Sequence, residues 1–289
     1  MSSSLSAEQV ASYHRDGFLF PLRAMPSEDA ARLRIEIERI EAMTCVEGMK
    51  HSLNQYFRVN AQIVLPCVAR LAANDTLVDA VESMLGPDIL VWSAELFIKE
   101  PHSSKHVSWH QDLTYWGLGE TEELVTAWLA LSPATEASGC MRFVAGSHLQ
   151  PIVPHIDTFE SDNLLSRGQE LAVDVDEADA VSVVLEPGEF SLHHGRMYHS
   201  SCPNVSEERR IGIAIRYVTP GVKQQVGERD YAMLVRGIDE QHNWINIAAP
   251  TQLFSDYSLA LYDRILGDQS AALAQGAHRS VNLYSNPPD

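Results

Sequence analysis

Trp109-His110-Gln111-Asp112 is the stretch around which this sequence is organised, and its distant partner is His199 in Met197-Tyr198-His199-Ser200-Ser201. In an extended strand, residues i and i+2 point to the same face. His110 and Asp112 can therefore present an imidazole nitrogen and a carboxylate oxygen side by side. A second imidazole from another strand would complete a facial triad and leave metal positions open. This ligand set suits non-haem Fe(II) and oxygen chemistry.

A His-x-Asp motif alone is also typical of a hydrogen-bonded surface pair, so the segment after His199 carries the argument. Ser201 follows His199 by two residues and Arg210 follows it by eleven. An arginine fork suits a carboxylate, which it binds through two parallel hydrogen bonds. If His199 ends one strand and Arg210 begins the next, both reach into one barrel mouth. The combination predicts Fe(II) with 2-oxoglutarate.

On these motifs the sequence resembles the phytanoyl-CoA dioxygenase family of Fe(II)/2-oxoglutarate oxygenases, and its bacterial aminoethylphosphonate-type members most of all. The resemblance spans roughly Val10 to Thr219. The matching segments are Ser108-Trp109-His110-Gln111-Asp112, Thr126-Ala127-Trp128-Leu129-Ala130-Leu131, Ser138-Gly139-Cys140-Met141-Arg142-Phe143, Gly146-Ser147-His148, and His199 through Arg210. The resemblance implies a mainly β fold with flanking helices, a double-stranded β-helix of the jelly-roll or cupin-like kind.

The resemblance also implies roles for single residues. His110, Asp112 and His199 would be the catalytic Fe(II) ligands, with 2-oxoglutarate and O2 as cosubstrates. An acid at the Asp112 position implies hydroxylation, because related halogenases leave that position to chloride.

The distal carboxylate of 2-oxoglutarate would be bound by Arg210 and Ser201. Trp128 would line the cosubstrate pocket, although a buried tryptophan is otherwise a routine core residue. Thr126 would add a hydroxyl. Arg209 would point to the opposite face of the strand.

The substrate is a small molecule whose identity the sequence indicates only weakly. One acid, aromatic faces for an ammonium and basic groups suit a zwitterion such as 2-aminoethylphosphonate or its trimethylammonium analogue. A barrel salt bridge or a packed ring is the alternative role for each candidate. The candidate substrate residues are Glu95, Lys99, Tyr115, Trp116 and Arg196, with Phe97, His194 and Arg58 nearby.

Three other functions stay open at this point. The first is hydroxylation of a secondary-metabolite intermediate, such as a terpenoid acid or a carrier-bound amino acid. It predicts a wide, mainly apolar pocket lined from residues 44–58 and 221–250. The second is an inactive barrel that serves as a binding or sensing module. The third is a Zn or Mn site that acts without 2-oxoglutarate.

Composition limits the class of protein. The chain has 289 residues, 45% of them hydrophobic and 21% charged, which is ordinary for a globular protein. A net charge of −18 argues against nucleic acid as a partner. The absence of an apolar run of about 18 residues or a signal peptide predicts a cytoplasmic protein without a membrane span. The four cysteines show no paired spacing and are predicted to be reduced thiols. Nothing in the sequence indicates an oligomeric state.

The chain is predicted to be one domain, 1–289, with a helical part over 1–88, a jelly-roll core over 89–220 and a helical extension over 221–289. Helices are expected at 6–17, 27–43, 60–73, 76–85 and 255–266, with Ser6 and Gln9 forming a capping box and Ser27 capping the second helix. Strands are expected at 18–22, 90–99, 124–131, 140–145, 181–185, 189–194 and 209–218. The acidic stretch 150–180 is either a solvated insertion or a lid over the site.

Overall fold

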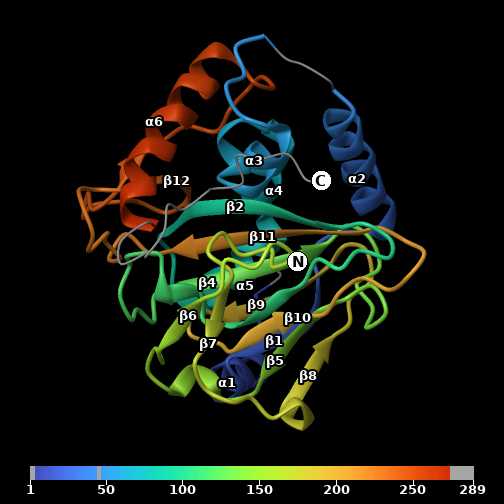
Figure 1. Ribbon diagram of the computed structural model, residues 1–289. Helices are drawn as coiled ribbons and strands as arrows, with labels where there is room; N and C mark the ends of the chain where they lie inside the picture. Colours follow the sequence, from blue (N-terminus) through green and yellow to red (C-terminus); the bar gives the residue numbers. More distant parts are fainter. Residues whose placement is uncertain (1–3, 44–46, 274–289) are drawn as a thin grey trace.

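Two β-sheets form the centre of the protein in the computed structural model, which describes residues 4–43 and 47–273 (Figure 1). The large sheet has the strand order β1-β9-β4-β11-β2-β12-β13, and the small sheet has the order β3-β10-β5-β8. A separate pair, β6-β7, lies in the insertion after β5. The jelly-roll prediction is confirmed. The strands are β1 (Phe18–Arg23), β2 (Ile89–Lys99), β3 (Val107–His110), β4 (Leu124–Ala130), β5 (Met141–Val144), β6 (His155–Asp157), β7 (Gln169–Leu171), β8 (Ala180–Val183), β9 (Glu189–His194), β10 (His199–Ser201), β11 (Arg210–Val218), β12 (Tyr231–Arg236) and β13 (Ile245–Asn246).

Helices cover the outer face of the large sheet. In Figure 1, α2, α3, α4 and α6 lie above β2 and β11, whereas β10, β5 and β8 lie on the other side. None of the described helices is long and apolar enough to cross a lipid bilayer. The helices are α1 (Ala7–Asp16), α2 (Ser27–Glu41), α3 (Leu53–Arg58), α4 (Pro66–Ala72), α5 (Asp75–Leu85) and α6 (Asp256–Leu273), and the short 3-10 turns are η1 (Ala61–Ile63), η2 (Asp112–Thr114), η3 (Ser147–Leu149) and η4 (Glu177–Asp179).

Strand alternation separates the core from the site. On β11, Ile211, Ile213 and Ile215 are fully buried against the helices, each worth about 1.5–3 kcal/mol of burial. The intervening residues, including Arg210 and Arg216, face the space between the sheets. A register slip of one residue would place both arginines in the helix-covered core. The apolar face therefore fixes which side chains reach the site.

Several sequence predictions of local structure are confirmed. Ser6 and Gln9 form the capping box of α1, and Gly17 ends that helix with a φ of 84°.

Two other predictions of local structure are wrong. The helix expected over 60–73 is broken into η1 and α4, because Pro66 favours an extended Leu65 (φ −109°, ψ 102°) before it. Ser27 lies inside α2 and does not cap it: the N-cap is Pro26.

The region after residue 220 is not only helical. β12 pairs antiparallel with β2 and extends the large sheet, and β13 pairs with β12. α6 is longer than the expected 255–266 and runs to Leu273. Cys67, Cys140 and Cys202 are free thiols, as predicted, while Cys45 lies outside the described residues.

Candidate metal and cosubstrate site

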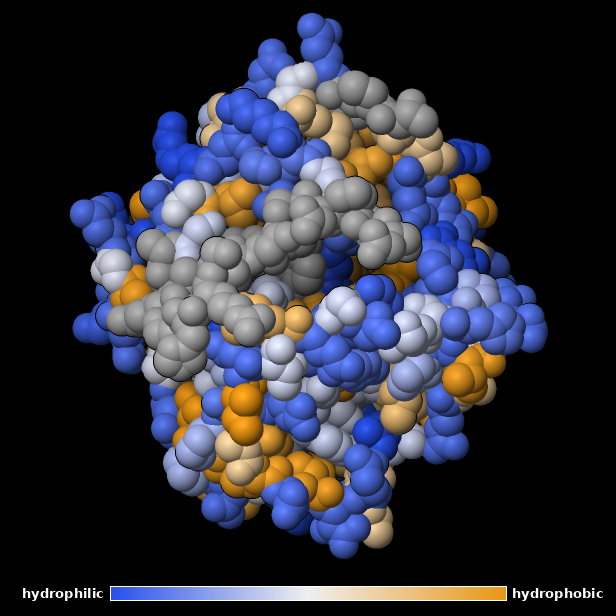
Figure 2. All heavy atoms as spheres, viewed as in Figure 1, coloured by the Kyte–Doolittle hydropathy of each residue, from blue (hydrophilic) through white to orange (hydrophobic). Residues whose placement is uncertain are grey.

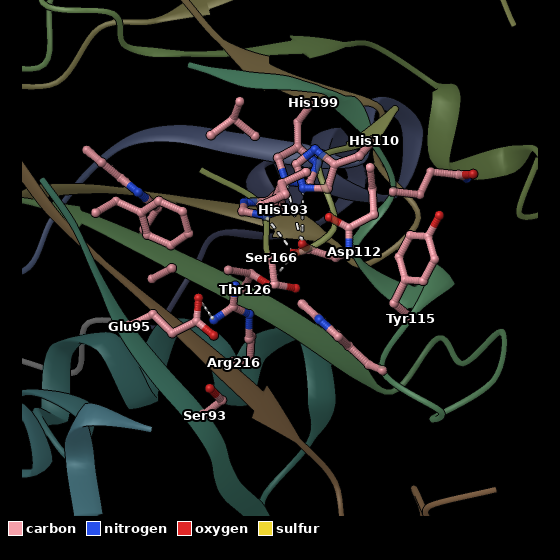
Figure 3. Close-up of a pocket in the computed structure, with 18 of the residues that line it drawn as sticks. Ser93, Glu95, His110, Asp112, Tyr115, Thr126, Ser166, His193, His199 and Arg216 are labelled. Atoms are coloured by element: carbon pink, nitrogen blue, oxygen red, sulfur yellow. Dashed lines mark hydrogen bonds and ion pairs between the residues drawn. The ribbon is translucent and has the colours of Figure 1, made fainter. Parts of the chain in front are cut away.

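Three buried side chains converge between the sheets. His110 is the last residue of β3 and pairs directly with His199, the first residue of β10. Asp112 begins the 3-10 turn that follows. The Nε2 atoms of His110 and His199 lie 3.5 Å and 3.7 Å from Asp112 Oδ1. Figure 3 shows the three side chains pointing toward one another, and their candidate donor atoms lie within 4.8 Å of one another.

Both imidazoles use Nδ1 for a hydrogen bond, which leaves Nε2 of each ring available to a metal ion. Nδ1 of His110 lies 2.9 Å from the carbonyl oxygen of Ser108, and Nδ1 of His199 lies 2.9 Å from that of Met197. These carbonyls fix the Nδ1–H tautomers and leave each Nε2 as a lone-pair donor. Burial lowers the pKa of His199, which keeps it neutral. Burial opposes ionisation of Asp112, but the attraction between its carboxylate and a proton on the facing imidazoles, His199 foremost, holds its pKa well below the usual range. This donor set fits Fe(II).

The second carboxylate oxygen of Asp112 faces the large sheet. Thr126 Oγ1 lies 3.5 Å from Asp112 Oδ2, and His193 Nε2 lies 3.7 Å from the same atom. The sequence suggested that the Thr126 hydroxyl contacts the cosubstrate. In the structure, this hydroxyl lies beside the carboxylate of Asp112. The sequence did not single out His193, which lies on β9 and faces the cavity.

Arg210 lies at the deep end of the cavity. Its Nη1 donates to the carbonyl oxygen of Gly139 at 2.8 Å, and its guanidinium carbon lies 5.3 Å from the ring centre of Trp128. Its Nε is buried and has no hydrogen-bond partner among the described residues. Burial lowers the pKa of Arg210 to about 10, so the side chain stays charged at neutral pH. A buried cation with a free N–H edge fits a carboxylate ligand.

Ser201 and Trp128 complete this end of the cavity. Nζ of Lys99 donates to Ser201 Oγ at 2.8 Å. Because that bond uses a lone pair of the hydroxyl, the O–H of Ser201 is left to donate elsewhere. Trp128 packs against Gly212, where an added Cβ would lie 1.9 Å from Trp128 Cζ2. Lys99, expected to contact substrate, instead lies fully buried behind Ser201.

The outer part of the cavity holds three of the five predicted substrate residues: Glu95, Tyr115 and Trp116. Glu95 Oε2 lies 3.1 Å from Nη1 of Arg216, a residue that the sequence analysis did not select (Figure 3). Arg216 also lies over the ring of Trp116, with 4.8 Å from its guanidinium carbon to the ring centre. The sequence does contain a signal for Arg216: it lies six positions after Arg210 on the same strand, and an even spacing puts both side chains on one face.

The remaining predicted residues lie elsewhere. Arg196 forms ion pairs with Glu120 and Glu122 and is not part of the cavity lining, because it sits in the turn between β9 and β10. Arg209 points away from the site, as expected, and contacts glutamates at the protein surface. Its ion-pair partners are Glu38, Glu41 and Glu100.

The insertion 150–180 covers part of the cavity. Leu165, Ser166 and Gln169 contribute to the lining. His155 Nε2 accepts a hydrogen bond from the backbone N–H of Gln111 at 3.0 Å, which ties the insertion to the segment between two candidate ligands. The insertion therefore lies over the site.

Aromatic and aliphatic side chains form much of the cavity lining. The space not filled by atoms amounts to about 1210 Å³ including the open mouth. In Figure 2 the surface is hollowed near its centre, where hydrophobic and hydrophilic residues meet. The apolar and aromatic lining residues are Val59, Trp92, Phe97, Val107, Tyr115, Trp116, Trp128, Met141, Leu165 and Ala214.

The profile of the family described as phytanoyl-CoA dioxygenase (PhyH) matches residues 13–212. The chain belongs to the phytanoyl-CoA dioxygenase family. The resemblance predicted from the motifs is therefore confirmed. The matched segment contains the three candidate metal ligands, Ser201 and Arg210, whereas β12, β13 and α6 lie beyond it.

Relatives of this family member cover most of its length. Peroxisomal phytanoyl-CoA dioxygenase of Rattus norvegicus is 27% identical over 236 residues, 74% of this chain and 68% of that protein. A probable alpha-ketoglutarate-dependent hypophosphite dioxygenase of Stutzerimonas stutzeri is 24% identical over 285 residues, 92% of this chain and 97% of that protein. The solved structure of the apo non-heme monooxygenase ThoJ shares 35% identity and a TM-score of 0.82, covering 92% of this chain and 98% of that one.

Family membership and the triad together establish the class of enzyme. This member of the phytanoyl-CoA dioxygenase family is an Fe(II)- and 2-oxoglutarate-dependent dioxygenase that uses O2. The predictions of an oxygenase, of iron and of 2-oxoglutarate are confirmed at this level.

Proposed function

We propose that His110, Asp112 and His199 bind Fe(II), and that Arg210 and Ser201 bind the distal carboxylate of 2-oxoglutarate beside Trp128. The support is the convergence of the three donor atoms and the buried, free N–H edge of Arg210. When bound, the iron and cosubstrate supply oxygen activation coupled to decarboxylation of 2-oxoglutarate to succinate and CO2. The chain's own residues position the substrate C–H bond and exclude water.

We further propose that the enzyme hydroxylates an intermediate of secondary metabolism, a molecule with an apolar or aromatic body and few net charges. The observation that carries this proposal is the ion pair between Glu95 and Arg216, because each side chain neutralises the other inside the outer cavity. Trp92, Trp116 and Phe97 then leave mainly aromatic surface for the substrate. That surface comes from the strands and the segment after β3. Among the described residues of 44–58 and 221–250, the cavity lining includes only Gln224 and Asp230, both polar, so the apolar lining expected from these two segments is wrong.

An aminoalkylphosphonate is the second candidate. It is favoured by the likeness to the hypophosphite dioxygenase, whose name specifies a phosphorus oxyanion. The same pair of residues could serve it differently, with Arg216 facing the phosphonate and Glu95 facing the ammonium. Trp116 would then offer an aromatic face to the cation.

Succinate formation across a substrate panel, with variants of the ion pair, separates the two candidates. The panel holds terpenoid acids, carrier-bound amino acids and aminoalkylphosphonates. If the pair is only self-neutralising, Glu95→Gln or Arg216→Met alone leaves an uncompensated charge and lowers turnover strongly. The double variant then recovers much of that loss. Preferential stimulation by an aminoalkylphosphonate, with the double variant as inactive as either single one, would overturn the first candidate in favour of the second.

A further inference from the structure

His193 is a fully buried polar side chain that the proposed ligand set does not use. It is 1% exposed, and neither of its ring nitrogens has a hydrogen-bond partner among the described residues. Burying such a group without a partner costs roughly 1–3 kcal/mol. Its ring packs between those of Phe143 and His199, with centroid distances of 5.1 Å and 5.0 Å. Packing alone would be served equally well by an apolar ring.

The strand register places the His193 side chain beside one oxygen atom of Asp112. His193 of β9 pairs directly with Thr126 of β4, so the two side chains stand next to each other on the inner face. Both point toward the same oxygen, Asp112 Oδ2, from 3.7 Å and 3.5 Å (Figure 3). The other oxygen, Oδ1, faces the two histidine ligands. The two oxygens of Asp112 therefore have different surroundings.

We propose that His193 is a positioning residue for the metal-binding carboxylate: its Nε2–H, together with the Thr126 hydroxyl, holds Asp112 Oδ2 so that Oδ1 faces the ion. This inference rests on the proposed ligand set. An imidazole carries at least one N–H in either protonation state, and a movement of about 0.8 Å would give a normal hydrogen-bond length. Holding the outer oxygen keeps the carboxylate from binding through both oxygens and so preserves an open position. Partners of this kind typically contribute 10–100-fold to metal affinity.

The test is an anaerobic titration of the metal-free full chain with Co(II). Binding is monitored through the visible absorption of the bound ion. His193→Phe keeps a ring but removes the donor, and His193→Gln places an amide N–H near the position of Nε2. We expect His193→Phe to bind Co(II) about 10–100-fold more weakly with an altered spectrum, and His193→Gln to stay within about threefold of the wild type. Equal affinity and spectrum in His193→Phe would overturn the inference while leaving the ligand set intact.

Two further measurements keep the outcomes separate. Asp112→Ala should abolish the Co(II) spectrum, and its failure to do so would overturn the ligand set and this inference with it. A wild-type protein loaded with Zn(II) and labelled with ¹⁵N reports the tautomer of His193 directly, with the signal assigned by its loss in His193→Gln. We expect a proton on Nε2. A proton on Nδ1 alone would overturn the inference even if His193→Phe did not fold.

Discussion

Replacing Arg210 with methionine should weaken 2-oxoglutarate binding by about two orders of magnitude. A guanidinium has five N–H donors, and one of those on Nη1 is already bonded to Gly139. The edge formed by Nε and Nη2 remains for the cosubstrate carboxylate. Two charge-assisted bonds at about 1.5 kcal/mol each give about 3 kcal/mol, or roughly 150-fold in Kd. Methionine keeps an unbranched stem against Trp128, so packing changes little.

The neighbouring residue supplies a matched control. Arg209 carries the same charge one position earlier, but its side chain contacts glutamates on the outside of the protein. Titration calorimetry under anaerobic conditions, with 2-oxoglutarate added to the Mn(II)-loaded protein, measures the Kd of each variant. Arg209→Met should stay within about threefold of the wild type. An Arg210→Met variant that also stays within threefold would refute the assignment of Arg210 to the cosubstrate.

Three other predictions follow from single contacts. Gly212→Ala should lower stability by about 1–3 kcal/mol and weaken 2-oxoglutarate binding, because its Cβ would lie 1.9 Å from Trp128; Gly267→Ala, with nothing within 4 Å in helix α6, is the control for thermal melting. Removing metal with a chelator should lower the Tm of the wild type but leave that of Asp112→Ala unchanged, since only the native metal site links binding to folding. His155 accepts from the Gln111 N–H, and burial lowers its pKa to about 4. The unfolded chain, with a pKa near 6.5, then binds more protons between pH 6.5 and 4, so stability should fall by roughly 1–3 kcal/mol as pH falls through that window. Urea unfolding should show a flatter pH dependence for His155→Gln, and an unchanged slope would contradict this account.

The sequence predicts most of the inner site because its signals are local. His110 and Asp112 are two residues apart, and strand alternation is enough to place them on one side. Arg209 and Arg210 were correctly assigned to opposite faces for the same reason. Alternation puts Glu95 and Lys99, four positions apart, on one face of β2. It could not indicate depth along the strand, and Lys99 lies behind Ser201, beyond the cavity.

The missed features depend on contacts between segments far apart in the chain. Glu95 and Arg216 are 121 positions apart, and only the pairing of β2 with β11 brings them together. The role of His193 depends on its register with Thr126. Buried and exposed residues do not alternate regularly along β12. Its position near the edge of the large sheet therefore depends on its pairing with β2, which lies far away in the sequence. The break at Pro66, by contrast, was readable from the sequence, since proline disfavours a helical residue before it.

Strand β11 carries both arginines of the cavity lining, Arg210 at one end and Arg216 six residues later. At about 3.3 Å per residue, a strand sets these two positions roughly 20 Å apart along its length. The hydrogen bonds to β2 and β4 on either side make this spacing rigid. Side chains at the Arg216 end can therefore be exchanged without moving those at the Arg210 end, so the two ends of the cavity can be altered separately.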